Sequence, residues 1–126
     1  YGPPPPYEAV YRSPAAGTES EVLLRVGGIY RDAGVQLPDG YVERFDYLGL
    51  ELDLMRLLSA EEASFWAEGE IEAAGRSRDL QRRLLREHLL EWAPRFCEVV
   101  LEQPGVRFYH GVAKVLRGFL EEEAAV

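Results

Sequence analysis

Residues 44–55 read RFDYLGLELDLM, and the spacing of their apolar side chains decides the fold class of the chain. Phe45, Leu48, Leu52 and Met55 recur at intervals of three and four residues. That interval places them on one stripe of an α-helix. The stretch therefore predicts an amphipathic helix, which we expect to continue for about one further turn.

The same periodicity on both sides of this stretch predicts more helices. They are expected over residues 19–33, 59–75, 77–92, 94–101 and 106–120. No alternating run typical of β-strands stands out between them. The predicted fold class is therefore all-α, a bundle of at least five helices.

Several residues suggest where the predicted helices begin and end. Gly34 and Gly75 are natural terminators, and Ser77 is a candidate cap for the helix that follows. Ser59, with a glutamate three residues later, matches a capping box and should open the third helix. Pro94 should break its helix or lie in the first turn of the next one. We expect the last residues, from position 121 onward, to be frayed.

The first residues differ from the rest of the chain. Pro3 to Pro6 lack amide donors and favour an extended conformation, so the first fourteen residues are not expected to be helical. We divide the chain into a proline-rich hinge or extended segment, residues 1–18, and a helical part, residues 19–126. Residues 4–7 also read PPPY, a motif that WW-type domains bind. An interaction module that presents this run to a WW or SH3-type domain, with the run exposed and mobile, remains the alternative function.

Composition limits the other classes. The chain has 126 residues, of which 47% are hydrophobic, enough for one domain with a single core. Its net charge of −8 argues against a general nucleic-acid binder and is compatible with a basic peptide partner. No apolar stretch is long enough to span a membrane.

Candidate metal ligands and catalytic groups are few. His88, His110 and Cys97 do not form a short ligand pair, so we predict no metal site and no cofactor. We expect His88 at the core edge or in solvent, and Cys97 as a small buried apolar residue. Asp46 and Glu51 could serve a small hydrolase, but a solvated helix face is the favoured interpretation. We predict no catalytic residues.

Three blocks of sequence resemble the TorD/DmsD/NarJ-type family of molybdoenzyme chaperones. They are PPPPYEAVYRS at 3–13, IYRDAG at 29–34 with RFDYLGLELDLM at 44–55, and HLLEWAPRFCEVV at 88–100 with FYHGVAKVLRGFL at 108–120. Their order and spacing cover almost the whole chain. In the family, further helices precede the proline segment, so we expect this chain to hold the later part of a TorD-like helical bundle.

The resemblance implies a function. It implies a cytoplasmic, non-enzymatic chaperone that binds the twin-arginine signal peptide and the apo form of a molybdopterin oxidoreductase subunit. Such a chaperone assists cofactor insertion before assembly or export. Helices built to pack on the preceding ones would expose apolar faces. We therefore expect a homodimer that exchanges segments, or retention of a cleaved N-terminal partner.

The resemblance and the charge pattern together nominate peptide-binding residues. The candidates are Pro6, Tyr7, Glu8, Tyr11, Glu43, Asp46, Tyr47 and Glu51. Glu43, Asp46 and Glu51 are expected to form an acidic rim, and the tyrosines an apolar groove, for an arginine-bearing peptide. Tyr47 stands where the family has histidine; it can donate a hydrogen bond and stack, but it does not titrate near neutral pH.

Overall fold

The computed structural model describes residues 4–37, 40, 44–103 and 107–125, without the side chains of residues 107–109. Within these ranges the chain is all-α, as predicted, and a single bridge between Tyr7 and Tyr47 is its β contact. The helices are α1 Glu8–Tyr11, α2 Glu19–Asp32, α3 Leu48–Ala67, α4 Ile71–Leu84, α5 Leu90–Glu102 and α6 Arg107–Ala124. A short 3-10 turn covers Pro14–Ala16, and a π-helical turn covers Leu85–Leu89.

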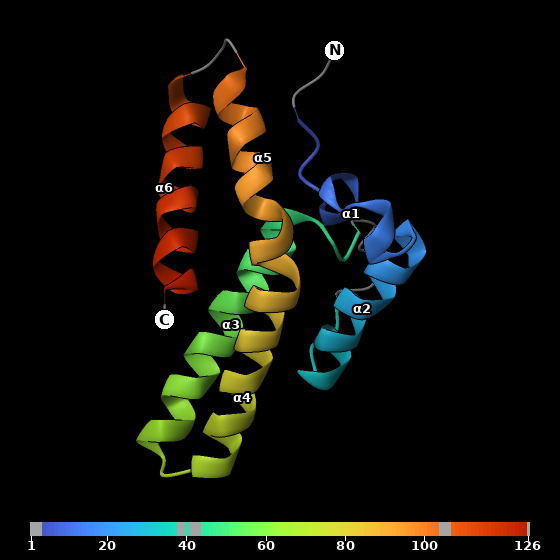
Figure 1. Cartoon of the computed structure of the whole chain (residues 1–126). Helices are drawn as coiled ribbons and strands as arrows, with labels where there is room; N and C mark the ends of the chain where they lie inside the picture. Colours follow the sequence, from blue (N-terminus) through green and yellow to red (C-terminus); the bar gives the residue numbers. More distant parts are fainter. Residues whose placement is uncertain (1–3, 38–39, 41–43, 104–106, 126) are drawn as a thin grey trace.

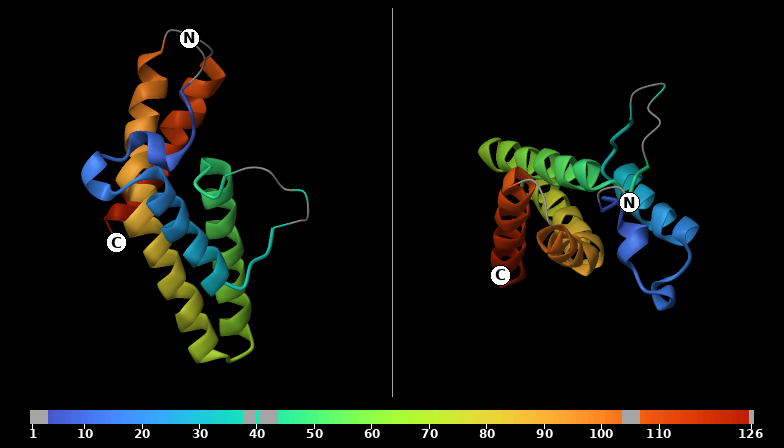
Figure 2. Two further views of the ribbon diagram at one scale, coloured as in Figure 1. Left: turned by 90° about the vertical axis from the view of Figure 1, so that its right-hand side faces the viewer. Right: turned by 90° about the horizontal axis from the view of Figure 1, so that it is seen from above.

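One long rod organises the bundle (Figure 1). It consists of α4, the π-helical turn and α5 in succession, and α3 and α6 lie antiparallel to its two halves. The short helix α1 contacts α5 and α2, and α2 contacts α4 on the side of the rod seen in Figure 2. None of the helices in the described part of the chain has the length and apolar character of a membrane-spanning segment.

The core forms where these helices meet the rod. Its buried apolar side chains are Val26, Ile29, Tyr30, Leu54, Leu58, Leu84, Leu85, Leu89, Trp92, Ala93 and Leu120. These residues come from α2, α3, the rod and α6. The apolar stripes of the helices are therefore buried only when more than two helices pack together. Burial of such side chains is the main favourable term in folding.

The second and third predicted helices are one helix, α3. The predicted capping box is wrong, because Ser59 lies mid-helix and its Oγ donates to the Met55 carbonyl, 2.8 Å away. This back-bonding is how a serine satisfies its hydroxyl inside a helix. The chain reverses instead at Gly69, whose φ of 75° lies in the left-handed region. The predicted end at Gly75 and the predicted cap at Ser77 are likewise wrong, since both lie inside α4.

The prediction that Pro94 breaks its helix or lies in the first turn of the next one is wrong, because Pro94 lies inside α5 and the rod continues through it. The π-helical turn comes directly before α5, and there the amide of Leu90 donates to the Leu85 carbonyl five residues earlier. A turn of this kind inserts an extra residue and often marks a functional position. The helix α6 continues to Ala124, so the fraying expected from residue 121 onward is also wrong up to that point.

Truncation of a core residue on α3 should test this packing. We expect Leu58→Ala, at a side chain 1% exposed, to lower the free energy of unfolding by about 2–5 kcal/mol. Leu24→Ala, at a side chain 75% exposed, is the matched control and should change it by less than about 0.5 kcal/mol. Urea denaturation followed by circular dichroism measures both; equal effects would contradict the assigned core.

Candidate functional site

The N-terminal segment docks onto the start of α3. The amide of Glu8 donates to the Asp46 carbonyl at 3.0 Å, and the amide of Leu48 donates to the Pro6 carbonyl at 2.9 Å. Tyr7 and Tyr47 form the bridge between them, with ring centroids 5.8 Å apart. Residues 6–8 are therefore paired with residues 46–48 and are not a free extended arm.

The side chain of Asp46 caps the N-terminal end of the short helix α1. Its Oδ2 accepts a hydrogen bond from the amide of Ala9 at 3.0 Å, which satisfies one of the unpaired donors of the first turn. This contact gives the local reason why Glu8–Tyr11 is helical, and the prediction that the first fourteen residues contain no helix is wrong there. The Asp46 side chain is fully buried.

Arg44 neutralises the buried Asp46. Its Nε and Nη2 donate to the two carboxylate oxygens of Asp46 at 2.9 and 2.8 Å, a bidentate pair. Its Nη1 lies 2.7 Å from the carboxylate of Glu19, and its guanidinium carbon lies 4.9 Å from the Tyr7 ring centre. The hydrogen bonds to Asp46 raise the pKa of Arg44. We call Tyr7, Glu19 and Asp46 the arginine cradle.

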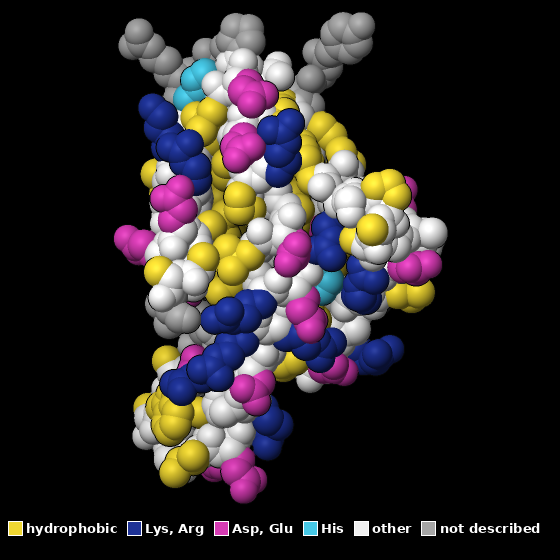
Figure 3. All heavy atoms as spheres, in the orientation of Figure 1, with side chains coloured by type: hydrophobic (Ala, Val, Ile, Leu, Met, Phe, Trp, Pro, Cys, Tyr) yellow, Lys and Arg dark blue, Asp and Glu magenta, His cyan; other side chains and the backbone are white. Residues whose placement is uncertain are grey.

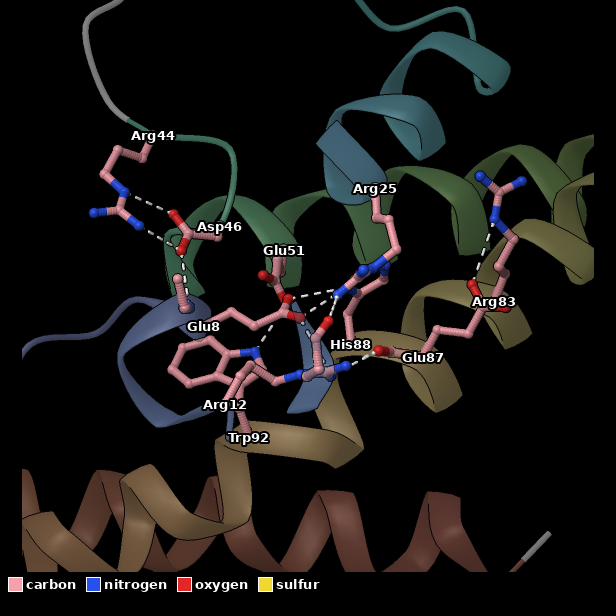
Figure 4. A network of polar contacts seen from close by, with 12 residues as sticks. Glu8, Arg12, Arg25, Arg44, Asp46, Glu51, Arg83, Glu87, His88 and Trp92 are labelled. Atoms are coloured by element: carbon pink, nitrogen blue, oxygen red, sulfur yellow. Dashed lines mark hydrogen bonds and ion pairs between the residues drawn. The ribbon is translucent and has the colours of Figure 1, made fainter. Parts of the chain in front are cut away.

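Glu8 and His88 form a buried pair at the π-helical turn (Figure 4). His88 Nδ1 lies 2.9 and 3.0 Å from the two carboxylate oxygens of Glu8, and the two side chains are 0% and 1% exposed. Arg12 lies 3.4 Å from the same carboxylate and donates to the Glu87 carbonyl at 2.9 Å. The pair therefore joins α1 to the middle of the rod. The expectation that His88 lies at the core edge or in solvent is wrong, because Glu8 provides the partner that burial requires.

Glu51 completes the cluster from α3. Its Oε1 accepts a hydrogen bond from Trp92 Nε1 at 3.1 Å, and the side chain is fully buried. Burial raises the pKa of Glu51 well above its ordinary value, and the neighbouring Glu8 raises it further. Burial therefore favours the protonated form of the Glu51 carboxyl. We call Glu8, Asp46, Glu51 and His88 the buried acid cluster.

The predicted acidic rim is wrong for the residues that the structure describes. Asp46 and Glu51 are buried together with Glu8, and each has a partner inside the chain. The second carboxyl oxygen of Glu51, Oε2, is buried without a hydrogen-bond partner among the described residues. Nor does Glu51 lie on a solvated helix face. Glu43 lies outside the described residues.

The tyrosines predicted to bind the peptide lie in two separate places. Tyr7 belongs to the arginine cradle, and the ring of Tyr47 lies next to that of Tyr7; both side chains are half-buried. Tyr11 instead packs inward, stacked on Trp92 with ring centroids 5.7 Å apart and edge-on to Phe96 at 5.8 Å. Tyr11 therefore belongs to the packing of α1 on α5.

This arrangement gives little support for a catalytic or metal-binding role. Within the described ranges, no group of three or more histidine, cysteine or acidic side chains has the geometry of a metal site. Two open hollows of about 410 and 390 Å³ lie on the described surface, and neither is lined by Asp46 or Glu51. Cys97 is buried, as predicted, and burial raises the pKa of its thiol. A hydrolase that uses the two carboxyls thus gains no support.

The fold and the buried acid cluster define an all-helical protein whose N-terminal segment is part of its helical core. The chain belongs to the nitrate reductase delta subunit family, because that family model matches residues 1–98. This family consists of chaperones for molybdoenzyme maturation, which confirms the family expected from the sequence. The matched residues include the proline segment, the arginine cradle and the buried acid cluster, and α6 lies beyond them. Comparisons with curated proteins and with solved structures found no match.

Breaking the buried pair on one side should be costly. We expect Glu8→Met to lower the free energy of unfolding by about 3–5 kcal/mol, because it leaves His88 buried without its partner. The double variant Glu8→Met, His88→Leu should be more stable than the single variant, since neither polar group remains. Chemical denaturation measures both. The single variant His88→Leu completes the set. If the double variant loses as much stability as the two single variants together, the pairing is contradicted.

Glu51 should make stability depend on pH in a particular direction. Its pKa is raised in the folded chain above the ordinary 4.5, so the folded state binds more protons than the unfolded state above pH 4.5. Its contribution is therefore largest at low pH and is lost as pH rises through the folded pKa. We expect Glu51→Gln to keep the Trp92 hydrogen bond and to remove this pH dependence, so that its stability relative to the wild type rises as pH increases above 4.5. Asp53→Asn, exposed on the same helix, is the control. A stability difference independent of pH would count against the protonated carboxyl.

Proposed function

We propose that this chain is a cytoplasmic chaperone for a molybdopterin oxidoreductase subunit. It binds the twin-arginine signal peptide and the apo form of that subunit and assists cofactor insertion before assembly or export. The observation that carries this proposal is the family match over residues 1–98. The net charge of −8 is compatible with a basic peptide.

The arginine cradle supports a specific place for the peptide. Arginine is bound best by bidentate carboxylates and by aromatic faces. Asp46, Glu19 and Tyr7 supply those groups, and at present they surround Arg44 of the same chain. A peptide arginine that takes the place of Arg44 would keep the buried carboxylate of Asp46 satisfied.

The surroundings of the cradle suit the rest of such a peptide. The exposed ring of Phe45 lines the hollow of about 390 Å³ together with Tyr30, Val35 and Leu37. This hollow begins one residue from Arg44 and offers an apolar surface to residues that follow the arginines. Tyr47, whose ring centre lies 5.8 Å from that of Tyr7, adds a second ring. Recognition would thus combine charge at the cradle with apolar contact at the hollow.

The alternative, a PPPY ligand for a WW or SH3-type domain, gains no support from these contacts. Pro6 and Tyr7 are engaged with Leu48 and Tyr47, so a partner domain would first have to detach them. Pro5 is exposed, but a single exposed proline does not present the motif.

Calorimetric titration with a twin-arginine signal peptide from a molybdoenzyme tests the proposal. We expect saturable binding that weakens at high salt and with a twin-lysine peptide, because lysine cannot form the bidentate pair. Glu19→Gln should weaken binding by about threefold to tenfold, whereas Arg44→Gln should strengthen it by freeing the cradle. The matched control is Glu21→Gln, exposed in the same first turn of α2.

Two outcomes would separate the parts of this proposal. Binding that is unaffected by Glu19→Gln and Arg44→Gln would remove the cradle and leave the chaperone function. Absence of binding to any twin-arginine peptide would contradict the peptide-binding function itself.

A further inference from the structure

The helix α6 has an outward face that no other described part of the chain covers. The helix lies at the edge of the molecule and packs mainly against α5 (Figure 1). Its inward side buries Ala113 and Leu120. On its other side Val112, Val115 and Phe119 are 50%, 75% and 39% exposed. Hydrophobic side chains also gather over α5 and α6 in the view of Figure 3. An exposed apolar stripe of this kind is typical of an interaction surface.

Val115 of this stripe also belongs to a line of residues with the spacing of a helix-pairing seam. Gly111, Val115, Gly118 and Glu122 follow one another at intervals of four, three and four residues. A Cβ added at either glycine would meet nothing within 4 Å, so the backbone is open to close approach there. Glycine inside a helix costs about 1 kcal/mol relative to alanine. A helix packed closely against this line would offset that cost, as small residues permit.

The two flanks of the seam differ in character. One flank carries the apolar side chains of Val112 and Phe119, and the other carries Lys114 and Glu121. Both charged side chains are exposed, and Glu121 is 73% exposed with only a 3.9 Å contact to Arg117. No ion pair of Lys114 is found among the described residues. The face therefore has one apolar edge and one edge with a positive and a negative charge seven residues apart.

We propose that α6 pairs with α6 of a second copy of this chain, in antiparallel orientation about a two-fold axis. In that pairing Val115 lies opposite Gly118 of the second copy, so that the larger side chain fills the space left by the glycine. The apolar flank places Val112 against Phe119, and the charged flank places Lys114 against Glu121. All these contacts occur twice by symmetry, which makes the face complementary to itself.

The charges select the antiparallel orientation. In a parallel pair each flank of one helix faces the opposite flank of the other, so Lys114 would meet the apolar edge at Phe119. In the antiparallel pair like flanks face each other, and Lys114 meets Glu121 twice. A free apolar client segment would match the apolar flank but would not require this charge pattern. The second copy is therefore the occupant that accounts for both flanks.

The interface is small, because a single helix from each copy forms it. Interfaces at the small end of the range are weak or transient, so we expect a dimer that dissociates on dilution. No segment is exchanged between the copies. The inference does not depend on the proposed function, since it uses α6 and not the arginine cradle.

Sedimentation velocity over a concentration series tests the pairing. The wild-type chain should shift reversibly toward twice its mass as concentration rises. Val115→Glu should abolish this shift, while Leu24→Glu, at an equally exposed apolar residue on α2, should leave it unchanged. Circular dichroism checks that each variant keeps its helical content. A dimer equally affected by both variants, or a monomer at every concentration, would overturn the proposal.

Charge reversal tests the register. Lys114→Glu and Glu121→Lys should each weaken association by about tenfold, because each replaces two attractive pairs with two repulsive ones. The double variant restores the attractive pairs and should regain most of the association. Because Lys114 is the only lysine in the sequence, a zero-length carboxyl-to-amine cross-linker should also join it to Glu121 of the second copy. A double variant weaker than either single variant would exclude this antiparallel register.

Discussion

The burial of Glu8 against His88 is the interaction on which the rest of the structure depends. Two ionisable side chains that are removed from water must satisfy each other, and here they come from residues 80 apart in the chain. Their contact fastens α1 to the π-helical turn of the rod. It also brings Tyr11 onto Trp92 and sets residues 6–8 beside residues 46–48. The proline segment thereby becomes part of the domain, and the arginine cradle forms on its outer side.

Much of the fold could be predicted from local periodicity, because each helix must bury an apolar stripe. The helices α2 and α6 follow directly from that pattern. The turn between α3 and α4 could not be placed, since Gly69 and Gly75 are both suitable breakers and only Gly69 adopts the left-handed conformation. The continuity of the rod through Pro94 could not be predicted from the sequence either. The π-helical turn that precedes it leaves no local signature in the sequence.

The residues of the candidate site could be predicted better than their arrangement in space. The resemblance to the chaperone family indicated Pro6, Tyr7, Glu8, Tyr11 and Asp46, with Tyr47 at the position of the family's histidine. All of these lie together except Tyr11, which packs on Trp92 and Phe96. Charge alone suggested an acidic rim, whereas the carboxyls are buried. Their burial depends on partners supplied by distant parts of the chain, chiefly Arg44, His88 and Trp92. Arg44 lies two residues from Asp46 and could have been recognised as its partner. Glu19 and His88 could not, because tertiary packing alone brings them close.

We expect the docked N-terminal segment to be held as firmly as the helical core. Hydrogen exchange at the amides of Ala9 and Leu48 tests it most directly, because these amides donate to Asp46 and to Pro6 across the junction. Both amides should show protection that approaches that of core amides in α3, such as Leu58. Exchange of both amides at the rate of an unstructured peptide, while α3 stays protected, would contradict it.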